Sequence, residues 1–277
     1  MSGPDYKTIG ISGESLTSDK YTNEGSPTHV RVKDGVIDIS NSCFFNKTSL
    51  ISIDIPNSVT IIGNQAFQGC TNLSSIVIPD SVTSIGDSTF YSCRNLSSIT
   101  LSNNIRSIGD SLLKTCTSLT SIVIPDSVES IGASSFRSCF LLSSIILPNN
   151  IKSIGSDAFI NCKVLTSITL PNNITTISSR LFANCFLLSS IVIPDTVTSI
   201  GDYAFVNCES LDNITMYKGD DKYEKIYEEN DISDRTLDVQ NFLDDKLDGW
   251  VVDRTFSLLL TPENIITDLS SNLNVVL

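Results

Sequence analysis

Apolar residues recur along this chain with a fixed period, and residues that stand one period apart are called a column below. The three most regular columns are cysteine at 70, 93, 116, 139, 162, 185 and 208, phenylalanine at 44, 67, 90, 136, 159, 182 and 205 with Leu113 in its one gap, and leucine at 50, 73, 96, 119, 142, 165, 188 and 211. Successive positions of a column stand 23 apart. A fixed internal period of this length is typical of solenoids, propellers and repeat arrays. The repeat therefore sets the architecture from residue 30 to residue 216.

Each copy contains its own succession of local signals. The pair Ile76 and Ile78 alternates with period two and is β-branched, which predicts a short strand. Pro79 ends that strand, because proline has no N–H to donate to a neighbouring strand. A second short extended piece, residues 82–85, leads to Gly86. The segment that follows, residues 87–93, has room for only a turn or two of α-helix or 3-10 helix.

A single copy of the repeat cannot bury its own apolar face, so neighbouring copies must stack. Stacking at the strand spacing of about 4.8 Å joins the strands into a parallel sheet and gives a rod roughly 38 Å long for eight copies. The sequence therefore predicts a solenoid of about eight 23-residue coils, with a parallel β-sheet of short strands and helical or 3-10 turns.

Three regions follow from the period. Residues 1–29 precede it and are expected to form an N-terminal flank or cap, and residues 30–216 form the solenoid. Residues 217–277 leave the period and contain 14 acidic and 6 basic residues. This acidic C-terminal region begins polar and becomes apolar in "WVVDRTFSLLL" at 250–260, which predicts a cap or a docked tail.

The motif "IPDTVTSIGDYAFVNC" at 193–208, with a leucine that opens each copy, resembles the BspA-like leucine-rich repeat family. The resemblance covers about two thirds of the chain. It implies a leucine-rich repeat solenoid that binds other proteins or cells as a surface adhesion or recognition module, without enzymatic activity. The first residues, "MSGPDYKTIGISGES", show no signal-peptide pattern and so favour the cytoplasm, whereas the resemblance favours the cell surface. The alternative function is a structural component or intracellular scaffold whose solenoid packs permanently against a neighbouring protein.

Composition argues against several other functions. The net charge of −13 disfavours nucleic acid as a partner, and no apolar run is long enough to be a transmembrane segment. His29 is the only histidine, and phosphate-loop and zinc-ligand spacings are missing, so we expect no enzyme, cofactor or metal. The cysteine ladder favours buried, reduced thiols over disulfides or metal ligands. The repeated glycine, as at Gly155, indicates a backbone requirement, either positive φ or close approach of another chain segment.

Two surfaces are candidate binding sites for a protein partner. The first is the outward face of the sheet, where a column of β-branched side chains lies beside a serine column. Strand formation alone would explain such a column, and ligand binding is the alternative. The sheet-face candidates are Val77, Thr100, Val123, Ile146, Thr169 and Val192.

The second candidate rests on differences between copies. Polar pairs after the earlier cysteines, such as Thr71-Asn72, become apolar in three later copies, which predicts an exposed apolar strip on the turn side. The members of this predicted strip are Phe140, Leu141, Ile160, Val164, Phe186 and Leu187. Three explanations stay open: the strip docks the 250–260 segment, it contacts an external partner or a second copy, or its residues belong to the core.

Overall fold

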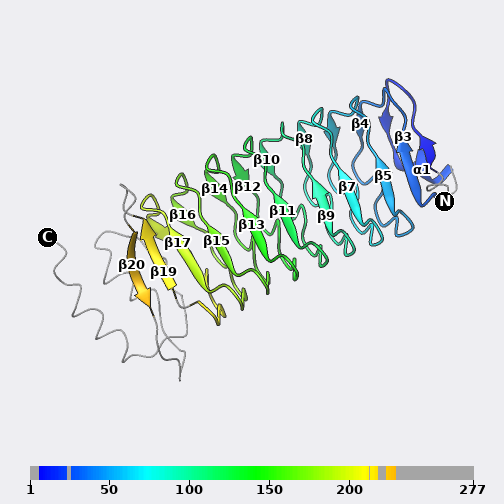
Figure 1. Cartoon of the computed structure of the whole chain (residues 1–277). Helices are drawn as coiled ribbons and strands as arrows, with labels where there is room; N and C mark the ends of the chain where they lie inside the picture. The colour runs from blue at the N-terminus through cyan, green and yellow to red at the C-terminus, as the bar shows by residue number, and fades with distance from the viewer. Residues whose placement is uncertain (1–5, 24–25, 212, 218–222, 229–277) are drawn as a thin grey trace, which may run out of the picture.

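A computed structural model of the 277-residue chain describes residues 6–23, 26–211, 213–217 and 223–228. Figure 1 shows an elongated rod in which short strands lie side by side across the long axis, with β3 near one end of the rod and β20 at the other. Each coil contributes one longer strand, one shorter strand and a run of turns.

The longer strands form one face of the rod, which we call the sheet face. They are β1 (Lys7–Ile9), β3 (His29–Val32), β5 (Ser52–Asp54), β7 (Ser75–Val77), β9 (Ser98–Thr100), β11 (Ser121–Val123), β13 (Ser144–Ile146), β15 (Ser167–Thr169), β17 (Ser190–Ile193) and β19 (Asn213–Tyr217). They hydrogen-bond in the groups β1-β3-β5, β7-β9, β11-β13 and β15-β17-β19, which follow one another along the rod.

The shorter strands form a second face. They are β2 (Ser15–Leu16), β4 (Asp38–Ile39), β6 (Ile61–Ile62), β8 (Ser84–Ile85), β10 (Ser107–Ile108), β12 (Ser130–Ile131), β14 (Ser153–Ile154), β16 (Thr176–Ile177) and β18 (Ser199–Ile200). Every pairing among the strands named so far is parallel and joins residues 23 apart, as Ser121 with Ser144 and Val123 with Ile146. The predicted parallel solenoid, with about eight coils in the repeat region, is confirmed.

The third side of each coil, which we call the turn side, differs from the prediction of helical or 3-10 turns. Residues 87–93 form successive β-turns with left-handed φ angles of 55° at Ser88 and 60° at Ser92. The backbone N–H groups alternate in direction. That of Tyr91 donates to Ser88 O within the coil, whereas that of Phe90 donates to Leu112 O in the next coil. A helix would direct all these donors along its own axis, so bonding between coils replaces it.

The core of the rod consists of columns that run through all coils. The phenylalanine rings stack nearly parallel, with ring centroids 5.3 Å apart for Phe136 and Phe159 and 5.5 Å apart for Phe159 and Phe182. Leu113 fills the gap in the column and is fully buried. The coils of the rod therefore share one continuous aliphatic and aromatic core.

All eight cysteines are buried, as predicted, and their thiols are free. In the seven periodic positions, the thiol donates a hydrogen bond to the backbone carbonyl 26 residues earlier, as Cys139 does to Leu113 O at 3.2 Å. Burial raises the pKa of Cys139 to about 12. These thiols pack as small hydrophobic groups that satisfy a carbonyl of the neighbouring coil.

Close approach explains the repeated glycine. A Cβ atom added to Gly155 would lie 2.5 Å from the backbone nitrogen of Ala133 and 2.8 Å from its Cα, which is nearer than atoms can pack. The φ angle of Gly155 is not positive, so a left-handed backbone is not the reason for this glycine. At this corner the backbones of successive coils come into contact.

The stack extends into the predicted N-terminal flank. Strands β1 and β2 pair with β3 and β4 in the same 23-residue register, so residues 6–23 and 26–28 belong to a further coil. Helix α1 (Ser18–Asn23), the one helix among the described residues, takes the place of the turns. Its Tyr21 is fully buried and lies edge-on to Phe44, with ring centroids 5.3 Å apart. Tyr21 thus begins the aromatic column at this end.

At the other end, β20 (Tyr223–Glu228) pairs with β19 in the antiparallel direction, the reverse of every other pairing on the sheet face. This reversal ends the run of parallel strands. Residues 229–277, which include the 250–260 segment, lie outside the described residues.

Candidate functional site

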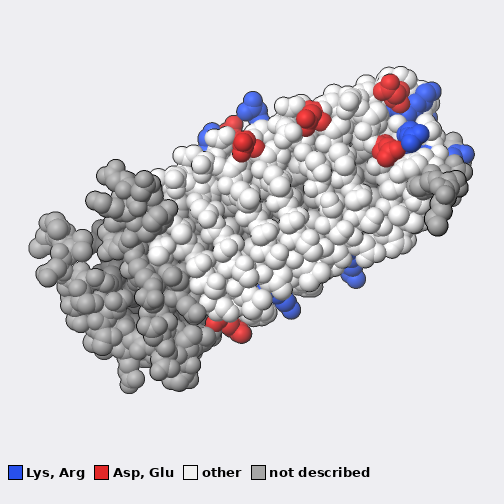
Figure 2. Space-filling model, viewed as in Figure 1, with Lys and Arg blue, Asp and Glu red and all other residues white. Residues whose placement is uncertain are grey.

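The sheet face exposes a column of β-branched side chains. Each strand buries its central residue and turns the flanking two outward, because side chains alternate across a strand. Val123 and Ile146 are each 74% exposed. Val77, Thr100 and Thr169 are exposed as well, and Val192 is half-buried. The structure therefore places all six sheet-face candidates in one outward column, and Figure 2 shows the rod surface with few charged side chains over its middle.

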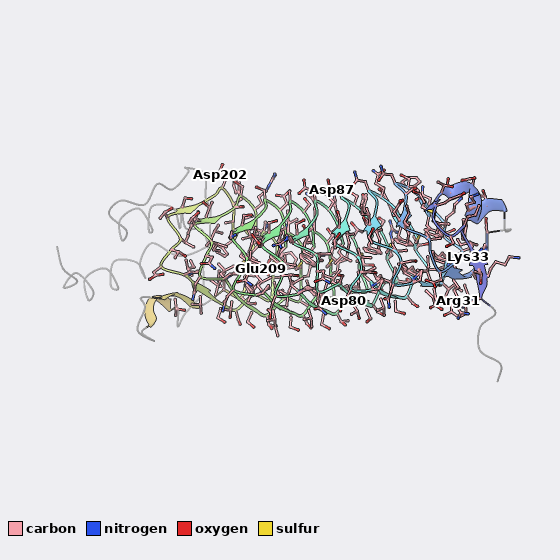
Figure 3. The ribbon with its side chains drawn as sticks, turned by 90° about the horizontal axis from the view of Figure 1, so that it is seen from above. Arg31, Lys33, Asp80, Asp87, Asp202 and Glu209 are labelled. Carbon is pink, nitrogen blue, oxygen red and sulfur yellow. The ribbon has the colours of Figure 1, made fainter. Side chains whose placement is uncertain are left out.

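The same column becomes charged at the N-terminal end of the rod. Arg31 and Asp54 form an ion pair at 3.2 Å, and the guanidinium carbon of Arg31 lies 5.1 Å from the ring centroid of Tyr6. Figure 3 shows Arg31 at this end. A shallow hollow of about 500 Å³ extends from Tyr6 and Asp54 to Val77 and Pro79.

Sequence reasoning missed Tyr6, although a signal was present: it stands one period before His29. The Tyr6 and His29 rings meet edge-to-face at 5.8 Å, and His29 Nδ1 shares a hydrogen bond with the Thr28 hydroxyl. The one histidine is thus part of the sheet face.

The turn side carries the predicted strip, with one exception. Phe140, Leu141 and Leu187 are exposed, at 36%, 50% and 48%, whereas Val164 and Phe186 are half-buried. These five residues, called the turn-side strip below, occupy two adjacent columns in three successive coils. Exposed apolar patches of this kind usually mark contact with another molecule.

Ile160 does not belong to this surface. It is only 9% exposed, and its backbone N–H donates to Asp157 O. Its backbone carbonyl accepts the N–H of Ser138 in the preceding coil. In its own coil, Asp157 forms ion pairs with Arg137 and Arg180 of the two flanking coils. The expectation that Ile160 is exposed is therefore corrected, and Ile160 is a buried residue.

A lysine lies at the centre of the turn-side strip. Lys163 Nζ is 5.0 Å from the ring centroid of Phe140 and 5.8 Å from that of Phe186, so the ammonium group lies between two aromatic faces. Such cation–π contacts contribute about 0.5–1 kcal/mol each at exposed sites. The pair of rings is therefore held in place by a cation that can also meet a carboxylate.

The carboxylate of Asp157 adds a second charged group to this side. Its Oδ2 accepts a hydrogen bond from Arg137 Nη1 at 3.0 Å, and its Oδ1 accepts one from Arg180 Nε at 2.8 Å. One carboxylate thus faces two guanidinium groups, and the cluster keeps a net positive charge.

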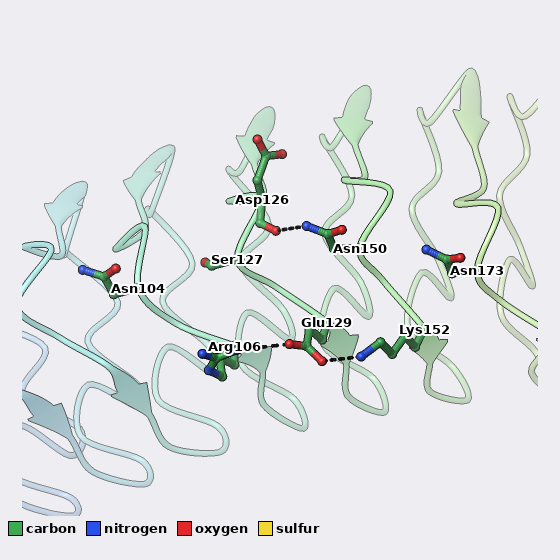
Figure 4. A pocket seen from close by; sticks show the side chains of 8 residues that line it. All are labelled: Asn104, Arg106, Asp126, Ser127, Glu129, Asn150, Lys152 and Asn173. Atoms are coloured by element: carbon green, nitrogen blue, oxygen red, sulfur yellow. Dashed lines mark hydrogen bonds and ion pairs between the residues drawn. The ribbon is translucent and has the colours of Figure 1, made fainter.

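The second face of the rod carries a polar hollow of about 380 Å³, shown in Figure 4. Glu129 lies between Arg106 and Lys152, with N···O distances of 3.1 and 2.7 Å. The hydrogen bond and charge of Lys152, followed by the charge of Arg106, lower the pKa of Glu129. The three charged groups at the centre of this hollow therefore pair with one another at the surface.

Two further observations concern the described residues only. No group of three or more histidine, cysteine or acidic side chains is arranged there to hold a metal ion. Helix α1, with six residues, is far too short to span a lipid bilayer.

Comparison with solved structures found leucine-rich repeat proteins. The TpLRR protein of T. pallidum is 30% identical, with 68% of this chain and 79% of that chain covered and a TM-score of 0.49. A leucine rich cell surface protein of Faecalibacterium prausnitzii is 25% identical, with coverage of 69% and 73% and a TM-score of 0.33. The pneumococcal vaccine antigen PcpA is 19% identical, with coverage of 70% and 63% and a TM-score of 0.41.

None of the curated proteins compared with the chain matched it. The family model described as the BspA type leucine rich repeat region matches residues 14–142 and 129–233. These two matches span most of the chain and include the coils that carry both candidate surfaces. The chain therefore belongs to the BspA-type leucine-rich repeat family.

Proposed function

We propose that this leucine-rich repeat solenoid is a non-enzymatic module that recognises other proteins at a cell or particle surface through its sheet face. The observation that carries the proposal is the outward column of β-branched side chains, in which Val123 and Ile146 are each 74% exposed. Family membership supports the proposal, because stacked repeats provide extended binding surfaces.

The free energy that each buried side chain can contribute to binding indicates what kind of partner would fit. Full burial of one valine or isoleucine side chain contributes about 1.5–3 kcal/mol. Association costs about 4–15 kcal/mol in lost translational and rotational freedom. Contact with a single coil is therefore insufficient, and the partner must cover several coils at once. A flat or extended protein surface meets this requirement better than a small molecule does.

The N-terminal end of the sheet face supplies polar recognition. Arg31, Asp54 and Tyr6 surround the hollow that ends at Val77, so a partner that lies along the apolar column meets a charged end. Polar groups at the margin of an apolar contact fix orientation and register more than they add affinity.

The cysteine thiols and the surroundings of His29 support the absence of enzymatic activity. Burial raises the pKa of the thiols, to about 12 for Cys185, whereas a reactive cysteine needs an accessible thiolate. His29 contacts Tyr6 and Thr28. The hydroxyl bonded to His29 is that of its neighbour in sequence, Thr28, and no acidic side chain among the described residues hydrogen-bonds the imidazole to complete a catalytic triad.

The test replaces apolar side chains without disturbing the sheet. Val123→Lys combined with Ile146→Glu copies, further along the rod, the ion pair that Arg31 and Asp54 already form in this column. The matched control, Thr175→Lys with Thr198→Glu, places the same charges on the second face, where both residues are exposed.

The resemblance to the BspA-like family implies matrix proteins among the partners, so we take adhesion to matrix proteins as the form of the proposal to test. Binding of the purified chain to immobilised collagen, laminin and fibronectin is measured by biolayer interferometry. We expect the wild type and the control to bind at least one of these proteins, and the sheet-face variant to bind it at least tenfold more weakly. Equal binding of both variants would remove the sheet face as the site. No binding by the wild type would overturn adhesion to matrix proteins.

A further inference from the structure

The turn-side strip has features that point to an occupant within the same chain. We propose that the acidic C-terminal region, residues 229–277, folds back along the turn side and covers the strip, with the 250–260 segment against Phe140, Lys163 and Phe186. This intrachain contact involves a different face from the sheet-face binding proposed above and does not depend on it.

The first argument is the place where the described chain ends. Because β20 is antiparallel, its last residue, Glu228, pairs with Asn213, the first residue of β19. Asn213 in turn pairs with Ser190, which follows Leu187 of the strip by three residues. Two strand spacings of about 4.8 Å place Glu228 roughly 10 Å along the rod from Ser190. The chain therefore continues from the corner where the strip begins.

The second argument is length. Residues 229–249 precede the 250–260 segment and can span up to about 70 Å when extended, at about 3.3 Å per residue. The strip covers three coils, or about 10 Å along the rod at the strand spacing. The connection is therefore long enough to bring the segment onto the strip without strain.

The third argument is charge. Residues 229–277 contain ten acidic and three basic residues. The turns at 110–118, 133–141, 156–164 and 179–187 contain four basic residues, Lys114, Arg137, Lys163 and Arg180, and two acidic ones, Asp110 and Asp157. Asp157 is already shared by two arginines. The turns of the next coil, 202–210, carry Asp202 and Glu209 and no basic residue, so the positive charge is confined to the strip and the coils before it. In a chain with a net charge of −13, the acidic C-terminal region complements that part of the turn side.

The fourth argument is composition. The 250–260 segment combines Trp250, Phe256 and three consecutive leucines with one acidic and one basic residue, Asp253 and Arg254. The strip combines aromatic and aliphatic side chains with the ammonium group of Lys163, which lies between its two rings. Apolar residues of the segment can cover the strip while Asp253 pairs with Lys163.

Tethering favours this occupant over a separate partner. A segment attached to the surface by a flexible connection has an effective concentration in the millimolar range, so even a weak contact is occupied most of the time. An external protein that binds the strip would have to displace the chain's own C-terminal region. The strip would then be available only to partners that compete with it.

Trp250 provides the test, because it is the only tryptophan of the chain. Its emission maximum and its quenching by acrylamide are measured in the full-length protein. We expect a blue-shifted emission and protection from quenching in the wild type. The double variant Leu141→Ser with Leu187→Ser, at two half-exposed positions, should red-shift the emission and increase the quenching constant at least twofold. Lys163→Glu should act in the same direction by reversing the central charge.

The matched control is Val77→Ser with Val123→Ser, which removes two exposed apolar side chains from the sheet face. It should leave Trp250 unchanged. Protection of the buried thiols from a thiol reagent shows in each variant that the solenoid is still folded, so a change in Trp250 then reports the contact alone. If the thiols of the leucine double variant react, that variant has unfolded, and the test then rests on Lys163→Glu, which removes no buried group.

Three results would overturn the proposal. Quenching of wild-type Trp250 as efficient as in denaturant would show that the segment is not docked. Protection that neither strip variant reduces would place the segment elsewhere. Protection that disappears on dilution, with a matching loss of dimer in sedimentation, would assign the strip to a second copy of the chain.

Discussion

The rod exposes apolar side chains on two faces that differ in origin. The sheet-face column is a consequence of the repeat, since every copy from Val77 to Thr215 places a β-branched residue there, and Val123 and Ile146 are largely exposed. The turn-side strip exists only because three copies depart from the polar residues of the others, as Leu141 does from Asn72. Beneath both faces lie the same phenylalanine, leucine and cysteine columns. A uniform column suits contact along the whole rod, whereas a local departure suits one defined segment.

Both exposed surfaces lie over the same buried interior. Because that interior contains buried thiols, alkaline pH is expected to destabilise it more than any substitution proposed below. Burial raises the pKa of Cys139 and Cys185 from an ordinary value near 9 to about 12. The folded state therefore holds protons that the unfolded state has lost, and stability falls as pH rises from about 9 toward 12, by up to about 1.4 kcal/mol per pH unit for each thiol.

With eight buried thiols, we expect the melting temperature to fall steeply between pH 8.5 and 10.5. Cys139→Ala removes one of these thiols and should make the melting temperature fall less steeply with pH. This change separates the effect of the thiols from the titration of lysine and tyrosine. A melting temperature that stays constant across this range would contradict the buried-thiol core.

The second largest effect is expected in the phenylalanine column. Phe159 is fully buried between the rings of Phe136 and Phe182. Phe159→Ala leaves a cavity in a close-packed stack and should destabilise the protein by about 3–5 kcal/mol in urea denaturation. Phe67→Ala, in an earlier coil, should have a similar effect. A loss below about 1 kcal/mol at either position would show that the column is not a continuous core.

The two halves of the rod also stabilise their turns differently, which a pair of substitutions can separate. In the later coils Asn184 donates to Asn161 Oδ1 at 2.8 Å and accepts from Asn207 Nδ2 at 2.7 Å, with a φ angle of 60°. Asn184→Ala should cost about 1–3 kcal/mol, since it removes two hydrogen bonds at a left-handed residue.

In the earlier coils, Asn64 Oδ1 accepts the backbone N–H of Asp87 at 2.9 Å. Asn64→Ala should cost only about 0.5–1.5 kcal/mol, because one exposed hydrogen bond is lost. Thermal unfolding of the two variants gives the comparison. Equal losses of stability, or a larger loss for Asn64→Ala, would show that the side-chain hydrogen bonds joining Asn161, Asn184 and Asn207 do not stabilise the later coils more than Asn64 stabilises the earlier ones.

The smallest expected effects concern the two exposed surfaces themselves. Val123→Ser should change the free energy of unfolding by less than about 0.5 kcal/mol, as surface substitutions usually do. Leu141→Ser should cost more, about 1 kcal/mol, if the C-terminal region covers it. Urea denaturation of the full-length variants measures both. A smaller loss for Leu141→Ser than for Val123→Ser would argue that the strip is uncovered.

The period made most of the fold predictable, because each column reports its own burial. The extra N-terminal coil escaped notice because it lacks the cysteine and proline signals, although Tyr21 stands one period before Phe44 and Leu16 one period before Ile39. The absence of helix on the turn side could not be read from one copy, since the hydrogen bond from Phe90 to Leu112 joins two coils.

The candidate surfaces were predictable to different degrees. Alternation along a strand placed the sheet-face column correctly. Ile160 was misplaced because its burial depends on the stacking of neighbouring coils, in which Ser138 N–H of the preceding coil donates to Ile160 O. The position of Lys163 between Phe140 and Phe186 likewise depends on stacking, and its apolar neighbours in sequence gave no indication of it.

Hydroxyl-radical footprinting of the full-length protein tests most directly the claim that one apolar surface is open and the other is covered. Phe45 and Phe140 form a matched pair, because they are the same residue type and are 39% and 36% exposed on the solenoid. The account predicts that Phe45 is labelled, together with Val123 and Ile146, while Phe140 is protected several-fold. Equal labelling of Phe45 and Phe140 would contradict it.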